Sequence, residues 1–326
     1  MKLGDCHSTL KIDMVRTATG CPEACLHCGA YTSFDNKRDF KMKELSREAL
    51  QENLTQPILG TRLSISDILA KYITTDVNVE PLRGDAFLNL AELVYDLSNG
   101  ESRAVCISHG LRTNVPPMKK RLEKIVELML SGKVPLFVLT VDTARNRATI
   151  SDEANIKGYT KTLEVLKPVL DMISRKKETN DISIPDVRVT ISLQGENDKN
   201  SPLFRQKAAE HFQEALQRSS LTASQRDSLV WDRERPYANF GRTDIYLHGH
   251  EEGECPVIPD IKFVKKILPH DHIHRGMVDM KGRVFRQINE RLRTYNSSLD
   301  PNAWEFLDND EDSEDLKRKS LPVIKG

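Results

Sequence analysis

The chain has 326 residues, 38% of them hydrophobic, so it can bury one large core, with or without a small cap. Its 48 basic and 48 acidic residues cancel, and this balance argues against nucleic acid or an anionic membrane as a partner. The longest apolar run, VPLFVLTV (134–141), is far shorter than the roughly 20 residues that span a bilayer. The N-terminus lacks the apolar region of a secretory signal, and six cysteines are too few for a disulfide scaffold, so we expect a cytoplasmic protein.

Strand-like and helix-like patterns alternate along most of the chain. Apolar, β-rich stretches occupy 10–19, 71–79, 103–109, 135–143, 186–194 and 227–234. Apolar stripes with a helical period fall between them, for example in 85–99 and 117–131, ahead of Gly100 and Gly132. Such alternation predicts an α/β fold built from parallel βαβ units, as a doubly wound sheet or a partial barrel. Ligands of both architectures bind beyond the carboxyl ends of the strands.

Three cysteines fall within eight positions, directly after the first of these stretches. Cys21, Cys25 and Cys28 form C-x3-C-x2-C. A structural zinc site requires a fourth ligand, which a second cysteine or histidine pair usually supplies. A redox dithiol uses only two cysteines in C-x2-C and leaves Cys21 unexplained. A four-iron cluster accepts three thiolates and keeps one iron open for another ligand. The spacing alone leaves these three roles open.

The cysteine loop resembles the signature of the radical S-adenosylmethionine (radical SAM) superfamily, in which C-x3-C-x2-C follows the first strand of a partial (β/α)6 barrel. Further segments resemble the family's landmarks in the same order. NVEPL (78–82) is similar to GGEPL, ISHGL (107–111) to TNGL, LTVDT (139–143) to the end of the fourth strand, and GRT (241–243) to the GRA turn. The resemblance covers roughly 8–244, and it departs from the family where Asn78 and Val79 replace two glycines.

The resemblance implies one [4Fe–4S] cluster held by Cys21, Cys25 and Cys28, with S-adenosylmethionine (SAM) at the open iron. It also implies that polar side chains near the strand ends bind SAM or the substrate. These side chains belong to His27, Glu80, Ser108, Thr140, Asp142 and Ser192. In the family, the segment that carries Glu80 contacts the amino group of SAM. His27 would lie near the adenine.

The same resemblance implies a division of the chain. Residues 1–244 would form the partial barrel, 245–306 a small C-terminal α+β cap that binds no cluster, and 307–326 a charged tail. A hairpin is expected around Lys281 and Gly282 in this cap. Cys106 lies within a β-rich run and is expected in the core. Cys255 lies in the cap, where a thiol can return a hydrogen atom to a substrate radical, and it is the candidate catalytic residue.

The function implied is reductive cleavage of SAM, followed by abstraction of a hydrogen atom from a polar substrate. A sugar, an aminoglycoside-like compound, a nucleoside or a peptide would suit, with epimerisation, dehydrogenation or rearrangement as the outcome. A reductase, flavodoxin or ferredoxin would supply the electron. The alternative from another class is a non-catalytic protein that binds zinc or an iron–sulfur cluster and docks on a partner.

Overall fold

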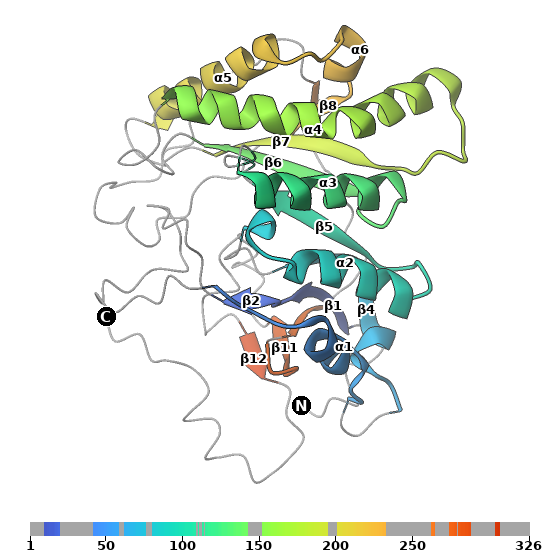
Figure 1. The fold of residues 1–326 in the computed structure, drawn as a ribbon. Helices are drawn as coiled ribbons and strands as arrows, with labels where there is room; N and C mark the ends of the chain where they lie inside the picture. Colours follow the sequence, from blue (N-terminus) through green and yellow to red (C-terminus); the bar gives the residue numbers. More distant parts are fainter. Residues whose placement is uncertain are drawn as a thin grey trace, which may run out of the picture.

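A single ten-stranded sheet organises the fold. The computed structural model describes residues 10–19, 42–58, 62–75, 80–108, 110, 113, 115–142, 152–194, 201–232, 262–264, 274–278, 280–287 and 304–306. Within these ranges the helices follow one another along the sheet, from α1 at one end to α5 at the other (Figure 1). A separate two-stranded ladder is formed by β2 (Ala18–Thr19) and β3 (Lys43–Glu44).

Six parallel strands form the centre of the sheet and stand there in chain order. They are β1 (Leu10–Val15), β4 (Leu69–Thr75), β5 (Arg103–Ser108), β6 (Leu136–Asp142), β7 (Arg188–Gln194) and β8 (Leu229–Asp232). Each strand pairs in parallel with the next one. The six expected strands are therefore confirmed as a parallel sheet of an α/β fold. A doubly wound sheet reverses its strand order at a switch point, and these six strands show no reversal.

Strands from the C-terminal part of the chain extend both edges of this sheet. β9 (Lys262–Val264) pairs in parallel with β8, and β10 (His274–Val278) pairs in parallel with β1. β11 (Val284–Gln287) and β12 (Trp304–Phe306) then add antiparallel strands beyond β10. The hairpin expected around Gly282 is confirmed, and this glycine has a φ of 75°. The described strands of the expected cap thus join the central sheet, while the division at residue 244 stays a prediction.

The helices that cover the sheet follow the apolar stripes of the sequence. Their bounds are α1 Arg47–Thr55, α2 Ala86–Leu97, α3 Pro116–Leu130, α4 Asp152–Thr179, α5 Ser201–Arg218 and α6 Ala223–Arg226. Leu90 of α2, Leu122 of α3 and Leu166 of α4 are fully buried, as the helical period requires. Gly100 and Gly132 follow α2 and α3 with positive φ, which ends each helix where the sequence predicts. The sequence analysis did not identify α1.

The two faces of the sheet differ in what packs against them. One large apolar cluster joins buried residues of α1 to α5 with alternate strand residues such as Phe137, Leu139 and Val141. The opposite face carries a separate small cluster of Val105, Leu136 and Val138, which includes no helical residue. The long helices that the structure describes therefore cover one face, as expected when right-handed crossovers join neighbouring parallel strands in order.

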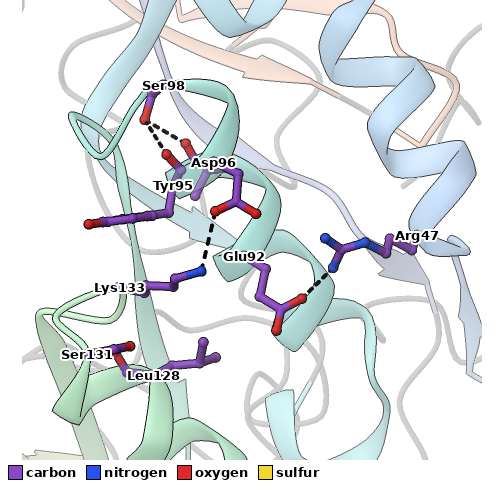
Figure 2. A network of polar contacts seen from close by, with 9 residues as sticks. Arg47, Glu92, Tyr95, Asp96, Ser98, Leu128, Ser131 and Lys133 are labelled. Carbon is purple, nitrogen blue, oxygen red and sulfur yellow. Dashed lines mark hydrogen bonds and ion pairs between the residues drawn. The ribbon is translucent and has the colours of Figure 1, made fainter.

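Exposed ion pairs connect neighbouring helices on the outer surface (Figure 2). Arg47 Nη1 of α1 lies 2.5 Å from Glu92 Oε2 of α2, and Lys133 Nζ lies 3.3 Å from Asp96 Oδ1. Lys133 also lies over the ring of Tyr95, 5.1 Å from its centroid. Surface pairs of this kind contribute about 0–1 kcal/mol each. We read this network as support for the helix layer, because its side chains are partly exposed and line no described pocket.

Candidate functional site

The carboxyl ends of the six parallel strands bring together the segments that the sequence analysis selected. Neighbouring parallel strands end at the same edge of a sheet. Four of the selected residues therefore lie at this edge or within two residues of it: Ser108, Thr140, Asp142 and Ser192. Glu80 follows β4 and begins the short 3₁₀ helix η4 (Pro81–Arg83). The placement of these five residues by sequence is therefore consistent with the sheet.

The loop that carries the three cysteines is closed at its base. β2 and β3, on either side of this loop, pair in antiparallel fashion, with Ala18 opposite Glu44 and Thr19 opposite Lys43. The N–H of Leu45 donates to the carbonyl of Thr17 at 2.9 Å and continues the closure. The ladder starts three residues after the end of β1, so it fixes both ends of the loop at the carboxyl edge of the sheet. Cys21, Cys25, Cys28 and His27 themselves lie outside the described residues.

Glu44 links the base of the cysteine loop, by hydrogen bonds, to the segment that follows Glu80. Its Oε2 accepts hydrogen bonds from the backbone N–H groups of Asp85 at 2.8 Å and Ala86 at 2.9 Å. These donors stand at the start of α2, where a carboxylate satisfies unpaired N–H groups and faces the positive end of the helix dipole. A Cβ atom on Gly84 would lie 1.7 Å from Glu44 Oε1. Glycine at this position thus makes room for the carboxylate.

Glu80 belongs to a buried polar cluster with β5. The residue is 5% exposed, and its Oε1 accepts a hydrogen bond from Ser108 Oγ at 2.5 Å. Ser108 Oγ in turn accepts from the N–H of Gly110 at 3.1 Å. Cys106, two residues earlier on β5, is fully buried, and burial together with the charge of Glu80 raises the pKa of its thiol well above the usual value. Cys106 is therefore a neutral core residue, as expected.

The turn after β5 is held against α4 by a compact set of hydroxyls and carbonyls. The carbonyl of Gly110 accepts from Thr162 Oγ1 at 2.7 Å and lies 3.1 Å from Thr113 Oγ1. Both hydroxyls also lie 3.0 Å from the carbonyl of Gly158. Gly110 has a φ of 60°, and a Cβ there would lie 2.6 Å from Thr162 Oγ1. Only glycine combines this conformation with so close an approach.

Thr140 lies on the other face of the sheet from this cluster. It alternates with Val138 along β6, whereas Ser108 pairs with Leu139 of the helix-covered face. Thr140 is fully buried, and among the described residues its Oγ1 has no hydrogen-bond partner. The expected set of SAM contacts is thus divided by the sheet. Glu80 and Ser108 contact each other on one side, and Thr140 stands apart on the other.

The backbone of β6 and β7 brings two more expected residues beside Thr140. Thr140 pairs with Ser192, and Asp142 pairs with Gln194. The side chains of Asp142 and Ser192 lie outside the described part of the structure, as does the whole of Cys255. Sequence reasoning missed Glu44 and Thr162. Gly84 before a helix and Gly110 after a strand were the only local signals for them.

Within the described ranges, no three His, Cys, Asp or Glu side chains gather as metal ligands, and no described helix is long and apolar enough to cross a membrane. Comparison of the chain with models of known protein families and with curated protein sequences finds no match. The cysteine loop and the edge of the sheet that holds its base are therefore the features of the chain that point to a function.

Proposed function

We propose that the chain is a radical SAM enzyme that acts on a polar substrate. The observation that carries this proposal is the closed base of the cysteine loop. The β2–β3 ladder holds both ends of a loop with three thiolate donors at the carboxyl edge of six parallel strands in chain order. A ligand held there would lie at the edge of the sheet that also carries Glu80 and the strand ends that follow it.

The donor set fits the implied cofactors. Cys21, Cys25 and Cys28 supply three soft thiolates, the number that leaves one iron of a four-iron cluster open. A bound [4Fe–4S] cluster would supply the electron that cleaves SAM and starts hydrogen abstraction. The buried Oγ1 of Thr140, with no partner among the described residues, fits a site that a hydrogen-bonding ligand completes.

The protein's own residues would orient SAM and exclude water. Ser108 holds the carboxylate of Glu80 in one orientation, and an oriented carboxylate is suited to accept hydrogen bonds from an ammonium group such as that of SAM. Thr140 and Asp142 would contact SAM, and Ser192, which pairs with Thr140 in the strand register, would contact the ribose or the substrate. His27 would lie near the adenine, and Cys255 would return a hydrogen atom to the substrate radical.

The test is anaerobic reconstitution of the full chain with iron and sulfide. We expect about four irons per chain, an electron paramagnetic resonance signal of a reduced [4Fe–4S] cluster, and formation of 5′-deoxyadenosine from SAM with dithionite. The triple variant Cys21→Ser, Cys25→Ser, Cys28→Ser should lose the iron, the paramagnetic resonance signal and the formation of 5′-deoxyadenosine. The variant Cys6→Ala should retain all of these properties. A colourless protein that holds zinc tightly would contradict the proposal and support the non-catalytic alternative.

Two further variants separate the assigned roles. Glu80→Gln should keep the iron content and raise the KM for SAM, because the amide is neutral and still accepts the hydrogen bond from Ser108. Cys255→Ala should keep SAM cleavage and lose turnover of the substrate. Unchanged turnover in Cys255→Ala would end the hydrogen-donor assignment without affecting the rest of the proposal.

A further inference from the structure

A pocket of about 570 Å³ lies at the opposite edge of the sheet from the cysteine loop. It is bounded by the end of α4, the connection to β7 and the first residues of β7 and β8. Pockets of about 300–1,000 Å³ are the usual size for small organic ligands. Because this pocket uses the amino ends of the strands, it is independent of the proposed radical SAM site.

The charged side chains of the pocket carry a net positive charge. Lys176, Lys177 and Arg188 contribute three cations, and Asp181 and Asp186 contribute two carboxylates. Asp181 already accepts hydrogen bonds from the N–H and Oγ of Ser183, at 2.8 and 2.7 Å, and these bonds lower its pKa. Asp186 Oδ1 lies 3.7 Å from Lys176 Nζ, which is longer than a hydrogen bond, so the two charges form only a weak ion pair. Lys177 Nζ donates to the carbonyl of Asp227 at 2.8 Å, a neutral partner that leaves its charge in place, so the lining keeps a net positive charge that favours an anionic group on a ligand.

The rest of the lining combines apolar side chains with one buried hydroxyl. Ile173, Val187 and Val230 contribute apolar surface, and Ile182 in the same lining is 98% exposed. Thr190 is fully buried, and within the described residues its Oγ1 has no hydrogen-bond partner. Buried hydroxyls are nearly always paired, so this atom indicates a polar group that a ligand would supply.

We propose that this pocket binds a small amphipathic hydroxy acid. The carboxylate of the ligand meets Lys176 and its cationic neighbours, the apolar body packs on Val187 and Val230, and a hydroxyl at the far end pairs with Thr190 Oγ1. Each part of the ligand is complementary to one feature of the lining, and binding involves no covalent step.

The experiment uses 4-hydroxyphenylacetate as the probe, titrated into the full chain and followed by saturation-transfer NMR. Three analogues change one group each. Phenylacetate lacks the hydroxyl, tyrosol replaces the carboxylate by an alcohol, and tyramine replaces it by an amine. We expect 4-hydroxyphenylacetate to bind about threefold or more tightly than either phenylacetate or tyrosol. Tyramine should bind most weakly.

Substitutions in the lining should each change the affinity for only some of these four compounds. Thr190→Val should remove the advantage of 4-hydroxyphenylacetate over phenylacetate. Lys176→Gln should weaken both acids about threefold and leave tyrosol unchanged, whereas Asp186→Asn should tighten both acids about twofold. Lys119→Gln is the matched control, because Lys119 is also a helical lysine beside a carboxylate, 3.4 Å from Glu123 on α3. It should change nothing.

Two results would overturn the proposal. One is equal affinity for 4-hydroxyphenylacetate, tyrosol and tyramine, which would mean that the pocket does not recognise the carboxylate. The other is binding that Thr190→Val, Lys176→Gln and Asp186→Asn all leave unchanged, which would place the probe elsewhere. Loss of the cluster by the cysteine triple variant should not affect binding, so failure here and failure of the proposed function are distinguishable.

Discussion

Buried hydroxyl groups on the two faces of the sheet differ in how they are satisfied. On the helix-covered side, Ser108 bonds to Glu80, Thr162 bonds to Gly110 and Gly158, and Ser174 bonds to the carbonyl of Ser224. On the opposite face, Thr140 and Thr190 are equally buried and have no partner among the described residues. The hydroxyls named on the first side are satisfied within it, although Asn155 Oδ1 of α4 and His211 Nδ1 of α5 on that side are buried without a partner among the described residues. The second face offers hydrogen-bonding groups to something else.

This contrast indicates where stability and function are located in the molecule. The large cluster under the helices contains most of the buried apolar residues that the structure describes, so the hydrophobic contribution to stability comes mainly from this side. Thr140 lies near the carboxyl edge, beside the proposed SAM site, and Thr190 lines the pocket at the amino edge. Removal of a buried hydroxyl should therefore change the free energy of unfolding in opposite directions on the two faces, and the matched pair of threonines below tests this.

The largest effect is expected for Gly110→Ala, on the helix-covered side. Alanine at a φ of 60° is strained, and its Cβ would approach Thr162 Oγ1 at 2.6 Å and Leu139 Cδ1 at 2.9 Å. We expect a loss of about 3 kcal/mol in the free energy of unfolding, measured with urea. Gly132→Ala is the control. It has a φ of 75°, but its Cβ would come no nearer than 3.3 Å to Pro185, so it should cost about 1 kcal/mol. Equal losses would disprove the close packing at Gly110.

A matched pair of threonines compares the two faces directly. Thr162→Val removes a hydroxyl with bonded partners and should lower the free energy of unfolding by about 1–2 kcal/mol. Thr140→Val removes a buried hydroxyl with no partner among the described residues and should raise it, by up to about 1 kcal/mol. Both residues are fully buried, so burial does not distinguish them. If Thr140→Val destabilises the protein as much as Thr162→Val does, the contrast between the faces is wrong.

The link between the cysteine loop and α2 can be tested by a double-mutant cycle. Glu44→Ala removes the cap on Asp85 and Ala86 and should cost about 1 kcal/mol. Gly84→Ala should cost a similar amount, because the new Cβ displaces the same carboxylate. The double variant should then cost little more than either single variant, a coupling of about 1 kcal/mol. Additive losses would show that Gly84 and Glu44 act separately.

The smallest effect is expected for His211 of α5, whose ring lies beside Asp152 at the start of α4. Burial lowers its pKa, although Asp152, with Oδ1 3.6 Å from Nε2, acts in the opposite direction. Lys207 adds to the lowering, and Glu210 and Glu214 oppose it. The unfolded chain then binds a proton more readily than the folded one, so stability should fall as the pH drops below the ordinary value of 6.5.

Urea unfolding between pH 7.5 and pH 5 measures this slope, and His211→Gln should abolish it. The pKa of Asp152 is lowered from 3.8, so this carboxylate titrates below that window. A slope that persists in His211→Gln would assign the pH dependence to other groups.

The sequence determined the six central strands and the helices α2 to α5, because periodicity along a strand or helix is a local property. Leu90, Leu122, Leu166 and Phe212 all occupy buried positions of helices where the apolar stripes place them. Gly100 and Gly132 marked two helix ends for the same local reason. The cysteine spacing and the polar residues after each strand also selected, by sequence alone, the edge of the sheet at which the candidate site lies.

Only the tertiary structure decided how these elements combine. The strand order excluded the doubly wound alternative, since pairing between distant segments leaves no trace in the period of any one of them. The same pairing separated Thr140 from Glu80 and Ser108, which the sequence analysis had placed in one set. Glu44 could not be identified from the sequence, because its partners Asp85 and Ala86 are 41 and 42 residues away along the chain. Side-chain contacts at such a distance are set by the packing of the whole domain.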